Sequence, residues 1–354
     1  MEKIKDIYSH LQDSISQKIF CNRLLYNITL EEKYLENIIE IMVEHSNQTM
    51  ELYSTLCDIK ISGKKIVIYG AGGVGKSFGN YLQRLNIPIA VFCDSNIEKQ
   101  KHIIYLNKDF KKVISLEELI NFYINDIIMI AINNPFYRKQ VRNNLLKQGF
   151  QEKQIIDVCD YFGRQYFDKS IPFLKRGIVK DKIFIDAGCY DLGTALEFKD
   201  WNMGGVVLSF EPDYDCYKKC IELCQFLREK EIHVYQKGVW CKTENLKFEV
   251  KKDGTTKVTN SKNGVELNVV TIDEMLGGRV CGFIKMDIEG SEYEALNGAK
   301  KTIIKDHPIL AISIYHKPED IIKIPEYILE LSGTYRFYIR HYSTNLSETI
   351  LYAL

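Results

Sequence analysis

The sequence predicts an α/β protein in which two three-layer domains follow an N-terminal helical arm. From Lys64 onward, short apolar runs alternate with amphipathic, helix-like segments, which is typical of a mostly parallel sheet covered by helices. Two of these runs end in glycine-rich turns, and a chain of 354 residues is long enough for two ordinary domains. We expect the arm over residues 1–60 and the domains over residues 61–157 and 158–354.

The arm is predicted to be helical because Thr29 and Glu32 have the spacing of a capping box and an apolar stripe follows them. No proline and only one glycine, Gly63, occur before residue 70. Since no chemical motif lies in this segment, we interpret it as a packing arm, a lid or a dimerisation element. A homo-oligomer would form through these helices.

The first domain opens with an apolar strand that runs into a glycine loop over residues 70–77. Gly70, Gly72 and Gly75 fit the GxGxxG fingerprint of a Rossmann-like nucleotide site, in which backbone N–H groups approach a phosphate. The same loop fits the GxxxxGKS pattern of a P-loop, but the strand IIMIAI ends without the acid that would hold Mg²⁺. Asp94 ends the next strand, where a Rossmann domain places the acid that binds ribose hydroxyls. A third interpretation is a tight packing loop that binds nothing.

The segments IVIYGAGGVG, VFCDSN and IIMIAINNPFYRKQVRNNLLKQGF resemble the N-terminal Rossmann-like domain of bacterial sugar O- and N-acetyltransferases. In that family the domain binds the nucleotide-sugar. The resemblance implies a nucleotide or nucleotide-sugar ligand, with Gly70, Gly72 and Asp94 among its contacts. The left-handed β-helix that transfers acetyl groups in that family is absent here, so acetyl transfer is not implied.

The second domain begins with the strand KIFIDA and a glycine turn in which Asp186 precedes Gly188. An acid at this position would repel pyrophosphate, but it can hold an α-ammonium while backbone N–H groups bind a carboxylate. S-adenosylmethionine carries both groups, so we expect this cofactor. Glu211 ends the next strand, where it can accept both ribose hydroxyls, and the adenine would lie after the third strand. The predicted cofactor-binding residues are Asp186, Gly188, Tyr190, Glu211, Gly238 and Val239.

Acids and a histidine end the next two strands. Asp287, Glu289 and Glu292 follow the fourth strand, and His316 follows the fifth. Because open α/β sheets bind ligands at the carboxyl ends of their strands, these residues are candidates for the reacting centre. The last two apolar runs, YRFYIRHYS and ETILYAL, are too close together for a helical crossover, so we predict that they pair antiparallel.

Residues 160–354 resemble the FkbM family of S-adenosylmethionine-dependent methyltransferases. The likeness is carried by QYFD at Gln165–Asp168, then by FIDAGCYDLGT, SFEPD, KGVW, IKMDIEGSEYEALNGA, ISIYHKPEDIIKIPEYI and IRHYS with ETILYA. It implies a class I methyltransferase sheet with an antiparallel last strand. The family often has glycine directly after an acid of its first motif that corresponds to Asp191 here, whereas Leu192 stands after Asp191 in this chain.

The resemblance also implies methyl transfer to oxygen. Asp186 and Gly188 would hold the methionine end of the cofactor, Glu211 would bind the ribose, and Asp287 would lie beside the sulfonium and the substrate. His316 is the candidate base, because an unperturbed histidine pKa of about 6.5 suits proton transfer near neutral pH. The alternative is a structural histidine bonded to the acids.

No metal site is predicted, although Asp287, Glu289 and Glu292 could hold a divalent ion. The competing interpretation is that the two glutamates stabilise a helix N-terminus, where the helix dipole favours acids.

Two other patterns have a structural interpretation as well as a functional one. Arg340 and His341 precede the final strand and could meet an anionic substrate or lie at the surface. Cys216, Cys220 and Cys224 form a row on one helix that cannot surround a tetrahedral ion, so we predict buried thiols.

The charge balance limits the partners, because Lys+Arg and Asp+Glu both number 47. Nucleic acids and anionic membranes attract proteins with a basic surplus, so we expect neither partner. No apolar run reaches the roughly 18 residues of a membrane span, and ten cysteines without an export signal suggest reduced thiols and a cytoplasmic location.

The sequence therefore favours a methyltransferase that uses S-adenosylmethionine to O-methylate a sugar or glycan precursor in polysaccharide biosynthesis. The alternatives are a nicotinamide-dependent oxidoreductase, a nucleotide-sugar-binding protein without methyl transfer, and a non-catalytic scaffold.

Overall fold

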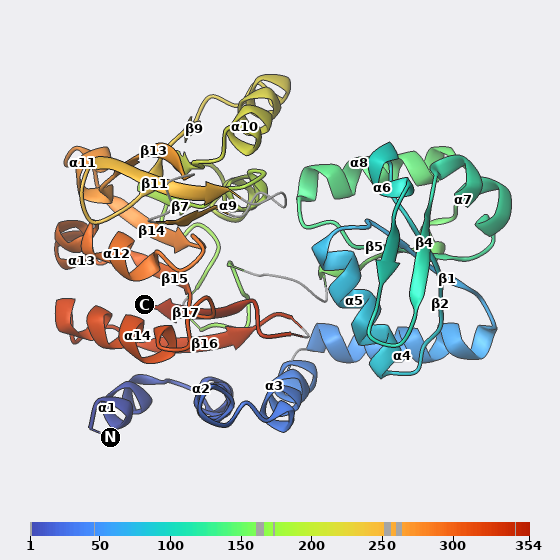
Figure 1. Ribbon diagram of the computed structural model, residues 1–354, viewed down its shortest axis with the longest axis horizontal. Helices are drawn as coiled ribbons and strands as arrows, with labels where there is room; N and C mark the ends of the chain where they lie inside the picture. Colours follow the sequence, from blue (N-terminus) through green and yellow to red (C-terminus); the bar gives the residue numbers. More distant parts are fainter. Residues whose placement is uncertain are drawn as a thin grey trace. The chain divides into compact units, whose positions relative to one another are not determined.

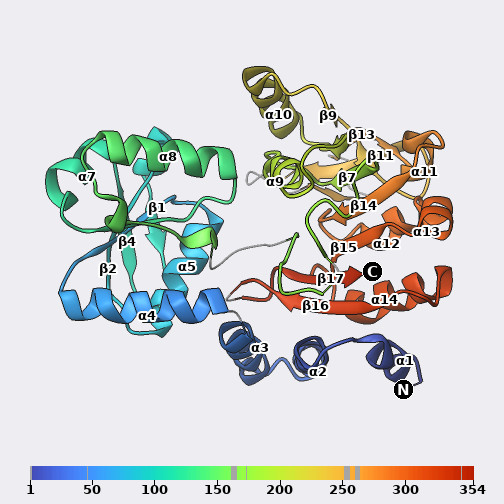
Figure 2. The same ribbon diagram turned by 180° about the vertical axis from the view of Figure 1, so that it is seen from behind.

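The computed structural model describes residues 2–45, 47–160, 166–172, 174–250, 256–259, 264–343 and 345–354. The chain forms two compact units (Figures 1 and 2). The large unit comprises Met1–Ile38, Tyr166–His341 and Glu348–Leu354, and the small unit comprises Ile39–Gln165 and Tyr342–Ser347. The α/β fold class is confirmed. The N-terminal helices are divided between the two units, and the domain limits at residues 61, 157 and 158 stay predictions.

The small unit is built on a six-stranded sheet in the order β3-β4-β2-β1-β5-β6. All neighbouring strands are parallel except β3 and β4. The strands are β1 (Ile66–Tyr69), β2 (Ile89–Cys93), β3 (Ile103–Tyr105), β4 (Phe110–Ile114), β5 (Ile127–Ile130) and β6 (Ile155–Asp157). The helical segments are α4 (Asn47–Ser62), α5 (Gly73–Arg84), α6 (Ile97–Gln100), α7 (Leu116–Tyr123), α8 (Pro135–Lys147), η1 (Glu152–Gln154) and η2 (Val158–Asp160), and α3 (Glu32–His45) crosses the boundary between the units.

Both faces of this sheet are covered, because successive residues of the buried strand β1 enter different apolar clusters. Ile66 and Ile68 pack with α4 and α5, whereas Val67 and Tyr69 pack with α7 and α8. Helix α4, which belongs to the sequence segment predicted as an arm, contributes Leu52, Leu56 and Ile59 to the first cluster. It is therefore one of the layers of the small unit.

The large unit is built on a seven-stranded sheet in the order β16-β17-β15-β14-β7-β8-β9. Strand β17 pairs antiparallel with both of its neighbours, which confirms the predicted direction of the last strand. The strands are β7 (Ile183–Ala187), β8 (Val207–Phe210), β9 (Ile232–Tyr235), β14 (Cys281–Met286), β15 (Ile309–Ser313), β16 (Phe337–His341) and β17 (Thr349–Ala353). The helices are α1 (Glu2–His10), α2 (Ser14–Thr29), α9 (Gly193–Trp201), α10 (Tyr214–Leu227), α11 (Ile272–Leu276), α12 (Glu292–Asn297), α13 (Lys300–Asp306) and α14 (Asp320–Leu331).

A second sheet of four strands, in the order β10-β13-β11-β12, belongs to the same unit. It consists of β10 (Gly238–Val239), β11 (Glu244–Val250), β12 (Thr256–Val258) and β13 (Val265–Val270). Strand β11 runs antiparallel to both β12 and β13.

Aromatic side chains form part of the core beside β7. The rings of Phe184 and Phe198 stack with centroids 4.4 Å apart, and those of Phe167 and Trp201 stack at 4.8 Å. Phe283 of β14 meets Phe184 edge-on at 5.4 Å. Phe167 comes from the QYFD segment, whose Gln165 lies outside the described residues.

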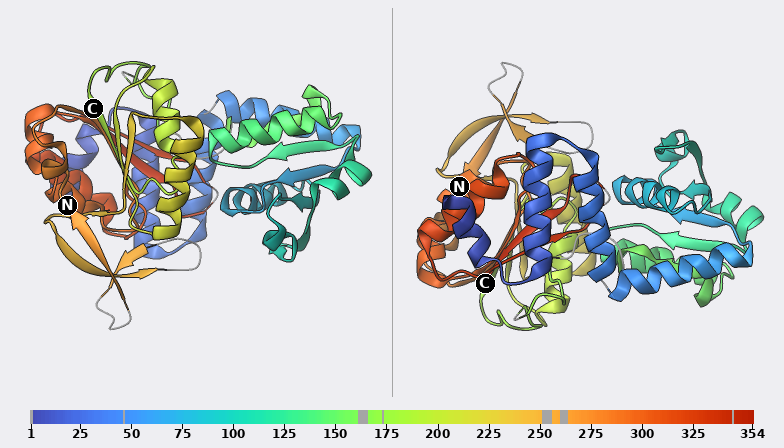
Figure 3. Two further views of the ribbon diagram at one scale, coloured as in Figure 1. Left: turned by 90° about the horizontal axis from the view of Figure 1, so that it is seen from above. Right: turned by 90° about the horizontal axis from the view of Figure 1, so that it is seen from below.

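Helices α1 and α2 are packed against the large unit, with α1 along α14 and α2 along β16 (Figure 1). Seen from below, the blue helices cross the red strands of the sheet (Figure 3). Gln12 N donates to the Phe337 carbonyl at 3.0 Å. The segment joining the two helices is thus bonded to the edge strand of the sheet.

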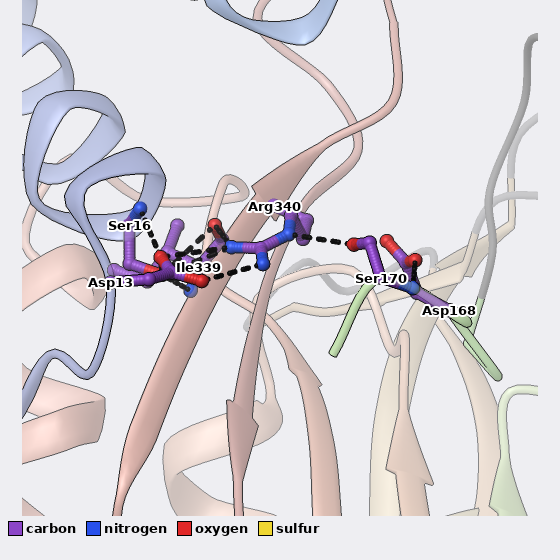
Figure 4. A network of polar contacts seen from close by, with 6 residues as sticks. All are labelled: Asp13, Ser16, Asp168, Ser170, Ile339 and Arg340. Atoms are coloured by element: carbon purple, nitrogen blue, oxygen red, sulfur yellow. Dashed lines mark hydrogen bonds and ion pairs between the residues drawn. The ribbon is translucent and has the colours of Figure 1, made fainter. Parts of the chain in front are cut away.

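Arg340 of β16 anchors this attachment (Figure 4). Its guanidinium is buried and donates to Asp13 Oδ2 at 2.7 Å and to Ser16 Oγ at 3.1 Å. On its other side it donates to Ser170 Oγ at 3.2 Å. The anionic-substrate interpretation of Arg340 and His341 finds no support, because Arg340 is occupied by Asp13 and the buried His341 lies 2.9 Å from Thr349 Oγ1.

All ten cysteines are free thiols. Cys216, Cys220 and Cys224 on α10 are buried, as predicted. Within the described residues, no helix combines the length and apolarity needed to cross a membrane.

The Arg340 attachment can be tested with Arg340→Met. Breaking this largely buried pair should lower the free energy of unfolding by about 2–3 kcal/mol, less than for a fully buried pair because Asp13 is partly exposed. Although burial opposes it, pairing with Arg340 and Ser16 lowers the pKa of Asp13. The stabilising effect should therefore be complete above the ordinary carboxyl pKa of 3.8 and should shrink as the pH falls below it.

Urea unfolding followed by circular dichroism measures the difference. Arg336→Met is the matched control, since Arg336 is exposed and immediately precedes β16. Equal losses in the two variants would contradict the assigned role of Arg340.

Candidate active site

The turn between β7 and α9 requires glycine at position 188. Gly188 has a φ of +78°, and a Cβ placed there would lie 2.1 Å from the carbonyl oxygen of Asp287. The backbone N–H groups of Gly188 and Cys189 both donate to the Phe210 carbonyl at 3.0 Å. The turn therefore lies directly against the ends of β8 and β14. Leu192 adopts a left-handed conformation, with φ +63°, at the position where the family often has glycine.

Asp186 lies beneath this turn rather than on its surface. Its side chain is fully buried, and its Oδ1 lies 3.1 Å from Lys285 Nζ on the neighbouring strand β14. Asp186 therefore already has a buried cation as its partner. Its predicted contact with the ammonium of the cofactor stays a prediction. Tyr190, in contrast, is half exposed on the outer part of the turn.

Glu211 follows β8 and is held by backbone N–H groups on both oxygens. Tyr190 N donates to Oε2 at 3.0 Å, and Asp213 N donates to Oε1 at 2.9 Å. Burial raises the pKa of Glu211 to about 7, although these two hydrogen bonds oppose the rise. The turn after β7 and the carboxylate after β8 are therefore one connected structure.

His316 and three carboxylates meet after β14 and β15. His316 Nδ1 lies 2.9 Å from Glu292 Oε1, and Nε2 lies 3.5 Å from Asp287 Oδ1 and 3.9 Å from Glu289 Oε2. The Tyr315 hydroxyl donates to the same Asp287 oxygen at 3.0 Å. Burial alone would lower the pKa of His316, but Glu292 and then the other two acids raise it to about 9.

A pKa of about 9 favours the protonated form of His316 at neutral pH, and this form has no lone pair with which to take a proton. Its predicted role as a base stays a prediction, and it requires prior loss of this proton. For the metal alternative, the structure groups a different set of residues from the predicted one, with His316 in place of Glu289. Asp287, Glu292 and His316 each offer a ligand atom within 4.8 Å of the others. The distances fit an ion-paired histidine without further groups, so this cluster does not by itself indicate a metal.

Gly238 and Val239 form the short strand β10 and are buried. Gly238 pairs with Val269, and a Cβ on Gly238 would lie 3.0 Å from Cγ1 of that valine. Trp240 N continues the ladder by donating to the Val270 carbonyl at 2.9 Å. Their predicted contact with adenine stays a prediction.

The glycine loop of the small unit is also closely packed. A Cβ on Gly75 would lie 1.9 Å from the carbonyl oxygen of Gly70. The first turn of α5, which begins at Gly73, therefore requires glycine at position 75. Gly72 is the N-cap of α5. Asp94 Oδ2 accepts from Ala71 N at 2.9 Å and from Lys99 Nζ at 3.1 Å. Asp94, which follows β2, thus holds the glycine loop that follows β1. Its predicted contact with ribose stays a prediction.

Lys285 and Tyr315 are the site residues that the sequence reasoning missed. Lys285 is 1% exposed although it lies in the apolar run CGFIKM. A lysine inside a buried strand needs a buried partner, and that pattern is a signal readable from the sequence. Tyr315 could be found only from its contact with Asp287.

A family match covers the strand ends that form this edge of the large sheet. Residues 186–337 match the family model described as the methyltransferase FkbM domain, a span that begins at the end of β7 and ends at the start of β16. This match supports a methyltransferase. Residues 62–156 match a model described as C2185-like, N-terminal, which does not confirm the resemblance to sugar acetyltransferases. No curated protein matches the chain significantly.

Solved structures also show likenesses to this chain. Methyltransferase FkbM from Methylobacillus flagellatus KT is 17% identical with a TM-score of 0.44, covering 87% of this chain and 99% of that chain. Fibrillarin from Aeropyrum pernix, with natively bound S-adenosyl-L-methionine, is 12% identical with a TM-score of 0.32, covering 51% and 67%. Precorrin-6y C5,15-methyltransferase from Geobacter metallireducens GS-15 is 11% identical with a TM-score of 0.34, covering 55% and 94%.

The close approach at Gly188 can be tested with Gly188→Ala. The added Cβ would overlap the Asp287 carbonyl and would strain a positive φ, so we expect a loss of about 2 kcal/mol or more in the free energy of unfolding. Gly333→Ala is the control, because nothing lies within 4 Å of its added Cβ. Urea titration compares the two, and a change below about 0.5 kcal/mol in Gly188→Ala would contradict the geometry.

Proposed function

We propose that the large unit binds S-adenosylmethionine at the carboxyl edge of its sheet and transfers the methyl group to a hydroxyl of a sugar or glycan precursor. The observation that carries the proposal is the FkbM domain match, which spans the strand ends where Gly188, Glu211 and Asp287 converge. Glu211 fits the cofactor, because its carboxylate, which the ribose hydroxyls would contact, is fixed by two N–H donors. When bound, S-adenosylmethionine supplies a methyl group on a positively charged sulfur.

The residues of the chain have separable tasks in this proposal. Glu211 accepts hydrogen bonds from the ribose hydroxyls with the lone pairs that its two N–H partners leave available. Gly188 and Tyr190 present the turn to the methionine end. Asp287 lies at the reacting centre, where its negative charge favours the cationic reactant and orients the acceptor hydroxyl.

The proton of the acceptor hydroxyl must also leave. We assign this step to Asp287, because the raised pKa of His316, about 9, favours its protonated form at neutral pH. His316 and the Tyr315 hydroxyl hold Asp287 in place. In the alternative, His316 first gives up its proton and then acts as the base.

The small unit is proposed to bind a nucleotide or nucleotide-sugar at its glycine loop, so that a sugar precursor is recognised by the same protein that methylates it. The positive charge of Lys99, held beside Asp94 and 3.8 Å from a Cβ placed on Gly72, lies at the start of α5 and would favour a phosphate. Titration of the full chain with uridine and cytidine diphosphate sugars tests this role. Enhanced NADH fluorescence on adding the protein would instead favour the nicotinamide alternative.

Incubation of the full chain with methyl-labelled S-adenosylmethionine and a panel of nucleotide-sugars and oligosaccharides tests the main proposal. We expect label in at least one sugar product and loss of that transfer in Glu211→Ala. Label confined to a non-sugar acceptor would overturn the substrate class alone. The proposal as a whole fails if the full chain neither binds the cofactor nor produces S-adenosylhomocysteine with any acceptor.

The affinity for S-adenosylhomocysteine should rise with pH around 7. Glu211 can accept from both ribose hydroxyls with both of its oxygens only when it is ionised, because protonation turns one oxygen into a donor. Burial raises the pKa of this carboxyl from 4.5 to about 7. Ligand binding therefore favours the charged form, so affinity should increase by about tenfold per pH unit below 7 and level off above it. Calorimetric titration between pH 5.5 and 8.5 measures the profile, and Glu211→Gln should flatten it. A wild-type profile without slope would contradict the assignment.

A further inference from the structure

We propose that Lys285 is a positioning residue that holds the cofactor turn from beneath, and that Asp186 is its counter-ion rather than a ligand of the methionine end. This inference rests on the proposed function, since it concerns the same cofactor site. It assigns a task to a buried charged pair that methyl transfer itself does not use.

Three contacts of the Lys285 ammonium carry the inference. Nζ lies 3.1 Å from Asp186 Oδ1 and donates to the carbonyl oxygens of Ala187 at 3.1 Å and Gly188 at 2.5 Å. The ammonium thus donates two hydrogen bonds to the turn and forms an ion pair with Asp186. Two of the three partners are consecutive carbonyls of the turn that would receive the cofactor.

The arrangement follows from the register of the sheet. Lys285 of β14 stands directly opposite Asp186 of β7 in parallel pairing, so the two side chains share one face. The exposed fraction of each side chain is at most 2%, and the Tyr166 ring lies 5.4 Å from Nζ. A ligand could reach the Asp186 carboxylate only if the turn above it moved away.

An isolated buried lysine would be costly, and so would an isolated buried aspartate. Their pairing leaves no net charge, while two hydrogen bonds from the ammonium fix the carbonyls of residues 187 and 188. With these carbonyls held inward, the turn has one orientation before any ligand arrives. A preorganised turn binds more tightly because less ordering remains to be done on binding.

The charge of Lys285 also reaches the ribose-binding carboxylate. Burial, and to a smaller extent the charge of Asp213, raises the pKa of Glu211. The backbone hydrogen bonds from Asp213 and Tyr190 lower this pKa, and the charge of Lys285 adds a smaller effect in the same direction. The thiols of Cys216, on α10, and of Cys189, in the turn after β7, also interact with Glu211. Lys285 thus keeps Glu211 more readily ionised, and removing it should move the pH profile of ligand binding.

The test titrates the full chain with S-adenosylhomocysteine by calorimetry and follows thermal unfolding in parallel. Lys285→Met alone leaves Asp186 buried without its cation, so this variant is expected to fold poorly. The double variant Asp186→Leu with Lys285→Met replaces the pair by apolar side chains and should restore folding. We expect it to bind at least about tenfold more weakly than wild type, with the pH midpoint of binding moved upward.

Three further variants complete the experiment. Asp186→Asn leaves Lys285 buried without its anion, so this variant should be less stable than wild type. It keeps the Lys285 donors on both carbonyls, so the affinity of its folded form should stay within about threefold of wild type. Lys285→Arg keeps the charge but has a planar group that cannot reproduce the same donor geometry, so it should fold and bind about fivefold more weakly. Lys305→Met is the matched control, because it removes an exposed lysine of the same unit and should change neither quantity.

The inference is overturned if the folded double variant binds like wild type, or if Asp186→Asn loses more affinity than Lys285→Arg. The second result would make Asp186 a direct ligand. If the double variant does not fold, the comparison of Lys285→Arg with Asp186→Asn still decides. Failure of the wild-type chain to bind S-adenosylhomocysteine would remove the proposed function together with this role, whereas a wrong pattern among the variants removes only the role of Lys285.

Discussion

The close packing of the turn after β7 against the end of β14 is the constraint on which the rest of the site depends. Without a Cβ at position 188, the two backbones approach until only a hydrogen fits between Gly188 and the Asp287 carbonyl. Asp287 N donates to the Ala187 carbonyl across the same contact. Through this contact the cofactor turn and the acid after β14 become neighbours, although about a hundred residues separate them in the sequence.

The acids at the strand ends differ in how their charge is compensated. Asp186 is paired with a buried lysine and Asp94 with Lys99, whereas Glu211 accepts from two backbone N–H groups and is not in an ion pair within the described residues. Burial is costly for a charged group without a counter-charge, which is why the pKa of Glu211 rises. Among these acids, Glu211 is therefore the one whose ionised form a hydrogen-bonding ligand would stabilise most.

The N-terminal helices have a structural role that also shapes the rim. Arg340 and Asp13 fasten α2 to the edge strand β16. Further along α2, Arg23 lies 3.5 Å from the Tyr315 carbonyl, and Asn27 donates to the Pro318 carbonyl at 2.8 Å. The segment that carries His316 is thus supported by a helix from the other end of the chain.

The sequence by itself determined the α/β class, the direction of the last strand and the strand ends that carry acids and glycine turns. Apolar periodicity, glycine turns and loop length depend on neighbouring residues, so they can be read along the chain. Only the tertiary structure decided which charges meet: Asp186 with Lys285, His316 with Glu292 and Arg340 with Asp13. These pairs set which carboxylates are buried and compensated and whether His316 holds a proton. They join residues from different elements, and a local sequence pattern determines neither the register of a strand nor the docking of a helix.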